Sequence, residues 1–121
     1  MPSVLVVDDE PSILNIFQII LSKQGYTVLT ADSGRQAQLL LAVANPDIVI
    51  LDVNLPDVQG GVICERIKYM TPSMPVVMCS AGAQVRDDEY IRRIGADAVL
   101  LKPFKSSDLM GLMDRFFNVE A

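Results

Sequence analysis

The stretch from Asp47 to Asp52 constrains the fold more than any other part of the chain. Four apolar residues, mostly β-branched, run without interruption between these two aspartates. A continuous apolar run this short is typical of a strand buried on both faces, as in a parallel sheet. In open α/β sheets, chemistry is placed at the carboxyl ends of such strands. Asp52 is therefore the residue whose presence most needs an explanation.

Similar apolar runs recur along the chain and alternate with segments of helical periodicity. The predicted strands cover residues 3–7, 26–30, 47–52, 76–79 and 98–101. Helical patterns follow them between residues 11 and 25, 33 and 45, 62 and 70, 84 and 94, and from 106 onwards. Five β-α units in series predict a parallel sheet with helices on both faces. We expect a flavodoxin-like, doubly wound α/β fold in three layers, with strand order 2-1-3-4-5.

Particular residues are predicted to start and end these helices. Pro11 suits the first turn of the first helix, where its missing N–H would have no partner, and Gly25 is predicted to end that helix. Residues 32–34 can cap the second helix, and Ser106 or Ser107 the last. The apolar side of the third helix is predicted to carry Val62, Ile63, Ile67 and Met70.

Length and composition limit the class of protein. The 121 residues fit one domain, predicted to span 1–121. The net charge of -5 argues against direct nucleic-acid binding by this domain, because phosphate binding needs a basic face. The sequence opens without a signal-peptide pattern and has no apolar run of membrane-spanning length. We therefore expect a cytoplasmic protein that does not contact a membrane.

The cysteine and histidine contents exclude several kinds of site. Cys64 and Cys79 lie in apolar patterns and are predicted to be small buried side chains rather than a disulfide framework. The chain contains no histidine, which excludes histidine-based catalytic triads and histidine-ligated zinc. Any phosphohistidine in its chemistry must belong to a partner.

Polar residues end four of the five predicted strands. Asp8 and Asp9 follow the first strand, Asp52 ends the third, Ser80 the fourth and Lys102 the fifth. These four strands are neighbours in the expected order, so the side chains should gather at one edge of the sheet. A single polar strand end is explained by the approach to solvent, but the whole set at corresponding ends is not.

Three carboxylates at one edge of a sheet need a cation. At about 5 Å they repel one another by roughly 3 kcal/mol per pair at an effective dielectric near 20. Oxygen ligands favour Mg²⁺ over zinc or copper. With Mg²⁺, the Lys102 ammonium and the Ser80 hydroxyl converging, the site suits an incoming phosphoryl group. Asp52 would then be the nucleophile that forms an aspartyl phosphate.

Short motifs around these residues occur in a characteristic order. They are Asp8-Asp9, Asp52 with Leu55-Pro56 after it, Ser80-Ala81 and Lys102-Pro103-Phe104. On a fivefold β-α pattern, this ordered set resembles the response regulator receiver domain of two-component signalling over essentially the whole chain. The resemblance implies that Asp52 is the phosphoacceptor, with a histidine kinase or a histidine phosphotransfer protein as the donor.

The resemblance also implies a metal site. Asp9 matches the direct Mg²⁺ ligand alongside Asp52, and Asp8 matches a residue that acts largely through water. Asn54 matches the position whose backbone carbonyl completes the site.

On the phosphoryl side, Ser80 matches the switch hydroxyl that turns inward to the phosphoryl oxygen. Lys102 matches the lysine that pairs with the phosphoryl group, and the Lys102-Pro103 bond is expected to be cis. Val99 stands where the family often carries Tyr or Phe, whose ring swings inward on activation. A β-branched side chain cannot make the same movement, so switching is expected to be weaker or to take another form.

We expect the protein to be a signalling switch rather than an enzyme with a separate substrate. Phosphorylation is expected to alter one face of it. By the resemblance, this face joins the helix at 84–94, the strand at 98–101 and the last helix, and includes Arg92, Arg93, Val99 and Lys105. A downstream output domain or effector protein would be its partner. The sequence leaves open whether the protein dimerises through this face. It also leaves open which kinase and signal act on it, and whether it belongs to a longer protein with an output domain.

Three other classes fit parts of the pattern. A hydrolase of the haloacid dehalogenase type would need a second aspartate where Asn54 stands, as well as a cap domain. A flavin-binding flavodoxin would need a phosphate loop where Asp8-Asp9-Glu10 would repel a phosphate. A pseudo-receiver, which binds partners without phosphorylation, is the main alternative. Val99 favours it, whereas the acidic set and Lys102 oppose it.

Overall fold

Five strands form a single parallel sheet in the order β2-β1-β3-β4-β5, as predicted. The computed structural model describes residues 2–117. Within it the strands are β1 (Ser3–Val7), β2 (Thr27–Ala31), β3 (Ile48–Asp52), β4 (Val76–Ser80) and β5 (Ala98–Leu101). Adjacent strands are in parallel register, with Val7 opposite Leu51 and Asp52 opposite Cys79.

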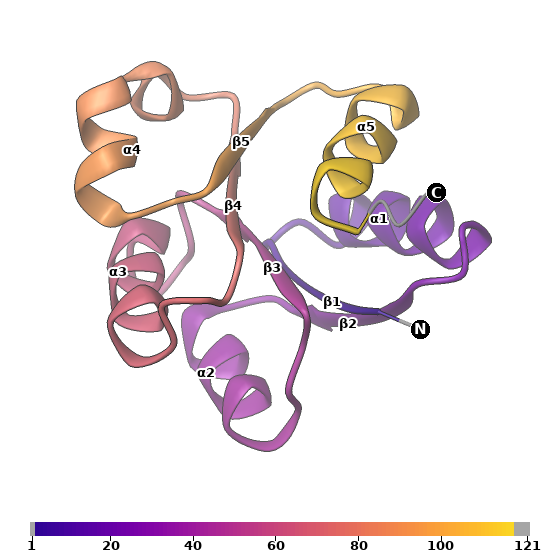
Figure 1. The fold of residues 1–121 in the computed structure, drawn as a ribbon, viewed down its shortest axis with the longest axis horizontal. Coiled ribbons are helices and arrows are strands. Elements are labelled where there is room, and N and C mark those ends of the chain that lie inside the picture. Colours follow the sequence, from indigo (N-terminus) through magenta and orange to yellow (C-terminus); the bar gives the residue numbers. More distant parts are fainter. Residues whose placement is uncertain (1, 118–121) are drawn as a thin grey trace.

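Helices cover both faces of the sheet (Figure 1). They are α1 (Pro11–Lys23), α2 (Gly34–Val43), α3 (Gly60–Met70), α4 (Asp88–Ile94) and α5 (Ser106–Phe117). α1 and α5 lie on one face, and α2, α3 and α4 lie on the other. The doubly wound, three-layer α/β prediction is confirmed. Among residues 2–117, none of the helices is both long enough and apolar enough to cross a bilayer.

The central strand β3 is buried along its whole length because it packs against helices on both faces. Ile48 and Ile50 belong to the core under α1 and α5, together with Phe17. Val49 and Leu51 belong to the core under α2, α3 and α4. The unbroken apolar run between the two aspartates follows from this two-sided burial.

Most predicted helix ends are confirmed. Pro11 occupies the first position of α1, and Gly25 beyond its end has a positive φ of 93°. The Ser33 hydroxyl caps α2 by accepting a hydrogen bond from the Gln36 N–H at 3.1 Å.

Cys64 and Cys79 are both free and buried, as predicted.

Two predicted helix starts are wrong. The pattern over 84–94 forms a 3₁₀ turn, Ala83–Arg86, followed by α4, because the Asp87 carboxylate accepts hydrogen bonds from the Glu89 and Tyr90 N–H groups and starts a new helix there. Ser106 and Ser107 lie inside α5. The Asp108 carboxylate instead accepts from the Lys105 N–H at 2.8 Å, closing the first turn.

The buried side of α3 also differs from the prediction. Val62 and Met70 are 41% and 72% exposed. Ile63 and Ile67 are buried as predicted, and the buried stripe is completed by Gly60, Gly61 and Cys64. Because the two glycines bring the start of α3 against the backbone of Asp52 and the ring of Tyr90, the neighbouring Val62 turns outward.

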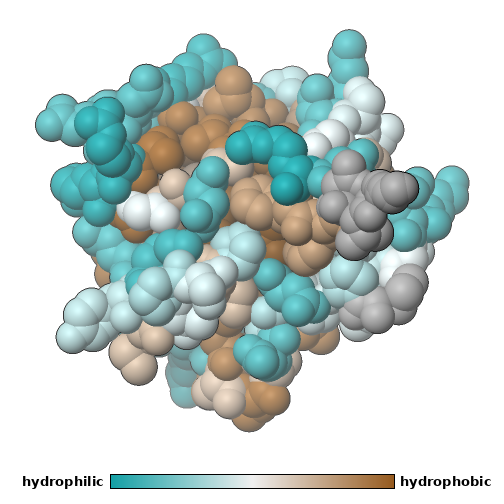
Figure 2. Space-filling model, in the orientation of Figure 1, coloured by the Kyte–Doolittle hydropathy of each residue, from teal (hydrophilic) through white to brown (hydrophobic). Residues whose placement is uncertain are grey.

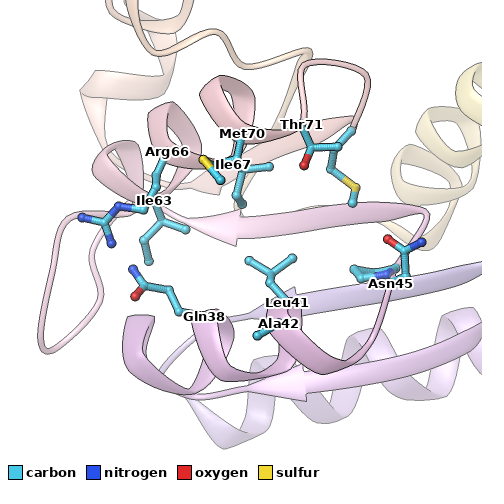
Figure 3. A pocket seen from close by; sticks show the side chains of 11 residues that line it. Gln38, Leu41, Ala42, Asn45, Ile63, Arg66, Ile67, Met70 and Thr71 are labelled. Carbon is cyan, nitrogen blue, oxygen red and sulfur yellow. The ribbon is translucent and has the colours of Figure 1, made fainter.

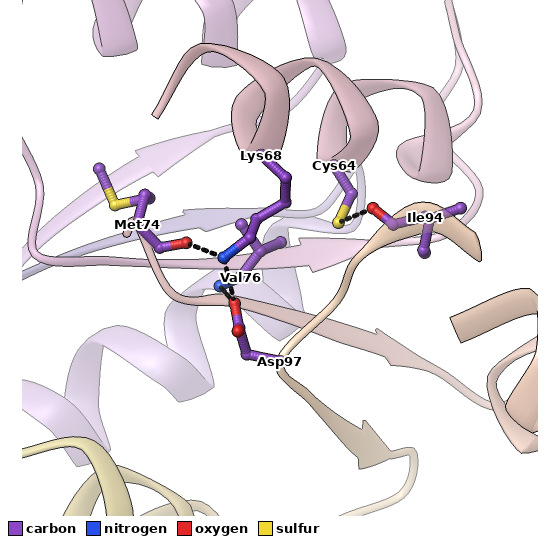
Figure 4. Close-up of polar contacts among 6 residues, drawn as sticks. All are labelled: Cys64, Lys68, Met74, Val76, Ile94 and Asp97. Carbon is purple, nitrogen blue, oxygen red and sulfur yellow. Dashed lines mark hydrogen bonds and ion pairs between the residues drawn. The ribbon is translucent and has the colours of Figure 1, made fainter. Parts of the chain in front are cut away.

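A polar contact ties α3 to the amino-terminal edge of the sheet (Figure 4). The Lys68 ammonium lies 2.8 Å from both an Asp97 carboxylate oxygen and the Met74 carbonyl oxygen. The same Asp97 oxygen accepts a hydrogen bond from the Val76 N–H at 2.8 Å, and Val76 is completely buried. Asp97 therefore satisfies a backbone donor that has no access to water.

We expect Asp97→Ala to lower the free energy of unfolding by about 1–3 kcal/mol, because the buried Val76 N–H loses its acceptor. Urea denaturation measures the change. The control is Glu65→Ala, since Glu65 lies 3.9 Å from Arg93 in an exposed ion pair and its removal should cost less than about 0.5 kcal/mol. Equal losses in the two variants would contradict a special role for Asp97.

Candidate metal centre

The carboxyl ends of β1, β3, β4 and β5 bring the predicted polar residues to one edge of the sheet. Asp8 and Asp9 follow β1, Asp52 ends β3, Ser80 ends β4, and Lys102 follows β5. The parallel register places Asp52 opposite Cys79 and Ser80 opposite Leu101, so the strand ends lie side by side.

Three carboxylates form the centre of this edge. One oxygen of each of Asp8, Asp9 and Asp52 lies within 4.8 Å of the other two. Asp8 and Asp52 are buried, with exposed fractions of 1% and 7%, whereas Asp9 is exposed. Like charges this close in a poorly solvated place destabilise one another.

Lys102 opposes part of this charge. Its Nζ lies 2.6 Å from Oδ2 of Asp8 and 3.7 Å from Oδ1 of Asp52. Burial acts to lower the pKa of Lys102, but the hydrogen bond to Asp8 and the charges of Asp52 and Asp8 outweigh it and raise the pKa. The lysine therefore stays charged, and in this structure it pairs more closely with Asp8 than with Asp52.

Asp52 is the carboxyl most affected by its surroundings. Burial is the largest influence and raises its pKa to about 6, against an ordinary value of 3.8. The Lys102 charge and the Val53 N–H favour the ionised form, while the charges of Asp8 and Asp9 disfavour it. A cation beside these carboxylates would remove the cost of ionising Asp52.

The Ser80 side chain is buried at the end of β4. Its Oγ accepts a hydrogen bond from the Gly82 N–H at 2.9 Å, and its carbonyl oxygen accepts one from the Lys102 N–H at 3.1 Å. The Lys102-Pro103 peptide bond is cis, as expected. Ser80 therefore joins the end of β4 both to the start of the β4–α4 connection and to the residue that follows β5.

Asn54 lies in the loop between β3 and α3, two residues after Asp52. It forms an isolated antiparallel bridge with Gln59, and the Gly60 N–H donates to the Val53 carbonyl oxygen at 2.6 Å. Gly60 is required here, because a Cβ at this position would overlap the carbonyl oxygen of Asp52. The loop that carries Asn54 is thus closed tightly at its base.

The sequence did not predict a role for one residue of this loop, Asp57. The Asp57 carboxylate accepts hydrogen bonds from the Gly34 and Arg35 N–H groups, 23 and 22 residues earlier in the chain. The adjacent Pro56 marks a loop, but sequence periodicity carries no signal for a contact across such a separation.

The donor set at this edge fits Mg²⁺. It consists of carboxylate oxygens from the ends of two neighbouring strands, and hard divalent cations prefer oxygen ligands. Burial raises the pKa of Asp52, so a cation bound beside this carboxyl group would favour its ionised form.

Several hollows lie away from the carboxylates, among them one beside α3 and one beside α5. A groove of about 360 Å³ separates α2 from α3, and apolar side chains such as Leu41 and Ile67 line it (Figure 3). A hollow of about 480 Å³ lies between β5 and α5, lined by Val99, Leu101 and Arg115 among others. Figure 2 shows hydrophobic surface exposed between α4 and α5, bordered by hydrophilic surface over α4.

Comparison with known sequences identifies the class of protein to which this fold and its acidic edge belong. The model of the response regulator receiver domain family matches residues 4–114. The chain belongs to this family and is a receiver domain of a two-component response regulator, a signalling switch.

Over the matched regions, curated relatives are about one third identical to the chain. It is 36% identical over 112 residues to the DNA-binding dual master transcriptional regulator RpaA of Synechocystis, covering 91% of the chain and 46% of RpaA. It is 34% identical over 106 residues to the alkaline phosphatase synthesis transcriptional regulatory protein PhoP of Bacillus subtilis, covering 88% of the chain and 44% of PhoP. The chain thus spans about half the length of these relatives.

Solved structures show the same fold. The chemotaxis protein CheY4 of Vibrio cholerae superposes with a TM-score of 0.89 at 29% identity, covering 97% of the chain and 99% of CheY4.

The raised pKa of Asp52 predicts a stability effect that depends on pH. A carboxyl whose pKa is higher in the folded state favours folding only while it is protonated, so its ionisation destabilises the metal-free protein as the pH rises from 3.8 through about 6. We expect Asp52→Asn to be more stable than the wild type above this range by up to about 3 kcal/mol. The gain should vanish below the range, where the wild-type carboxyl is protonated in both states.

Urea denaturation in the presence of a chelator, at about pH 3 and about pH 7.5, measures this difference. A gain of the same size at both pH values would contradict the electrostatic explanation.

Proposed function

We propose that Asp52 accepts a phosphoryl group in a Mg²⁺-dependent reaction and that residues 1–121 act as one receiver domain. The donor would be a histidine kinase or a histidine phosphotransfer protein. The observation that carries this proposal is the convergence of Asp8, Asp9 and Asp52 within 4.8 Å, with the Lys102 ammonium against the same carboxylates. Membership of the receiver family supports the same conclusion.

The proposed metal site uses the carboxylates of Asp9 and Asp52 and the backbone carbonyl of Asn54, with Asp8 acting through water. Both oxygens of Asp8 already accept hydrogen bonds, from the Lys102 ammonium and from the Glu10 N–H, which suits an indirect role. Mg²⁺ bound here would supply positive charge for the carboxylates and for the oxygens of the transferred group.

In the proposed transfer, an ionised Asp52 oxygen attacks the phosphorus atom of a phosphohistidine. A P–O bond to Asp52 forms as the P–N bond breaks, and the donor imidazole leaves and takes up a proton. Lys102 lies 3.7 Å from Asp52 and can neutralise an oxygen of the transferred group. The reaction is confined to the protein's own carboxyl group, so the domain acts as a switch.

The proposed switch begins at Ser80. Its hydroxyl would leave the Gly82 N–H and turn toward a phosphoryl oxygen on Asp52, drawing the β4–α4 connection with it. The outer face formed by α4, β5 and α5, which includes Arg92, Arg93, Val99 and Lys105, would then change.

An output domain or an effector protein would bind that face, or two copies would dimerise through it. The exposed Leu101 and the neighbouring hollow support a protein contact there. Because the matched relatives are named as transcriptional regulators, the partner could be a DNA-binding output domain, while this acidic domain itself would not touch nucleic acid. We propose that the protein is located in the cytoplasm.

We expect acetyl phosphate to add one phosphoryl group to the wild type in the presence of Mg²⁺, and none after chelation or in Asp52→Asn. Intact-mass spectrometry measures the gain directly. Undiminished labelling of Asp52→Asn would place the acceptor elsewhere. If neither acetyl phosphate nor a histidine kinase labels the folded wild type, the chain is a pseudo-receiver that binds its partners without phosphorylation.

Ser80→Ala should still be labelled at Asp52 but should lose the structural response. We expect amide NMR shifts at 81–101 to change on phosphorylation of the wild type and to change much less in this variant, because no hydroxyl is left to bond the phosphoryl oxygen. Ser107→Ala, an exposed position on α5, is the matched control. A full response in Ser80→Ala would contradict the switch role of Ser80.

A further inference from the structure

We propose that Asp57 is a positioning residue for the metal site. It holds the loop between β3 and α3 against the start of α2 and thereby fixes the Asn54 carbonyl beside Asp52. This inference rests on the proposed Mg²⁺ site and adds a contact from a different part of the fold.

The contact joins the loop to the first N–H groups of α2. The Gly34 N–H donates to Oδ1 of Asp57 at 2.9 Å, and the Arg35 N–H donates to Oδ2 at 2.9 Å. These donors have no carbonyl partner within the helix, because the first four N–H groups of any helix lack one. The carboxylate satisfies both and also lies at the positive end of the helix dipole.

Packing at the same point leaves the loop little room to shift. A Cβ at Gly34 would overlap Cγ1 of Val58, and it would lie 2.8 Å from Cδ1 of Ile63 and 3.2 Å from Oδ1 of Asp57. The absence of a side chain at Gly34 therefore lets the tip of the loop sit directly against the helix.

The base of the loop is held separately. Asn54 bridges to Gln59, and the Gly60 N–H bonds to the carbonyl oxygen of Val53. Asn54 thus belongs to the clamp at the base, and the chain runs from it through Leu55 and Pro56 to the Asp57 contact near the tip. Without the tip contact, only the bridge to Gln59 would hold the Asn54 peptide, and its carbonyl oxygen would be fixed less firmly for a cation.

Asp57 acts through this loop rather than by touching the metal. Among the described residues, the acidic cluster contains Asp8, Asp9 and Asp52 and does not include Asp57. Both Asp57 oxygens face α2, and the Gly34 and Arg35 N–H groups lower its pKa, so the carboxylate is charged at neutral pH. The contact is therefore present under the conditions in which Mg²⁺ would bind.

The test is a Mg²⁺ titration of the ¹⁵N-labelled protein, followed by amide NMR shifts, together with the Mg²⁺ dependence of labelling by acetyl phosphate. We expect Asp57→Ala to raise the Mg²⁺ dissociation constant about tenfold, the lower end of what supporting residues around metal ligands contribute. The labelling rate at saturating Mg²⁺ should stay close to that of the wild type. Asp57→Asn should be intermediate, because its amide oxygen replaces one carboxylate acceptor and not both.

Asp47→Ala is the matched control. Oδ2 of Asp47 accepts a hydrogen bond from the Ser3 N–H at 2.7 Å, a contact of the same kind at the opposite end of β3. It should change stability without changing the Mg²⁺ dissociation constant.

Unchanged Mg²⁺ affinity in Asp57→Ala would overturn the positioning role, and so would an equal loss of affinity in Asp47→Ala. If the wild type binds Mg²⁺ but is never phosphorylated, the proposed phosphoacceptor function fails, while the comparison of Mg²⁺ affinities still decides the role of Asp57. If the wild type binds no Mg²⁺, both proposals fail.

Discussion

The mutual repulsion of three carboxylates at one edge of the sheet is the constraint on which the rest of the site depends. Asp8, Asp9 and Asp52 are brought within 4.8 Å by the ends of β1 and β3, and burial keeps water from screening two of them. Lys102 offsets part of this charge but lies mainly against Asp8. Burial is the largest influence and leaves Asp52 with a raised pKa, and a divalent cation bound beside it would favour the ionised carboxylate.

The surrounding loops give this charged edge its connections to the rest of the molecule. The end of β4 is bonded to the start of the β5–α5 connection through Ser80 and Lys102. The β3–α3 loop is closed at its base by Gly60 and tied to α2 by Asp57. The loop after Asp52 is therefore hydrogen-bonded to α2, and the neighbouring end of β4 is hydrogen-bonded to the residue that follows β5.

Features set by neighbours in sequence or by strand order were predictable, and features set by side-chain geometry were not. Two-sided burial dictates an unbroken apolar run at β3, and parallel strands end at a common edge, so the acidic set followed from the sequence. The break before α4 depends on Asp87 capping two N–H groups, and the pairing of Lys102 with Asp8 depends on tertiary distances. The Asp57 contact spans more than twenty residues and leaves no periodic trace.

The pKa of Asp52, followed by ¹³C NMR of its carboxyl group with and without Mg²⁺, tests the electrostatic basis of the site most directly. The structure predicts a value of about 6 in the absence of metal, and a value below the ordinary 3.8 once Mg²⁺ is bound. A carboxyl that titrates near 3.8 under both conditions would contradict the claim that burial, together with the charges of Asp8 and Asp9, disfavours the ionised form of Asp52 until a cation binds.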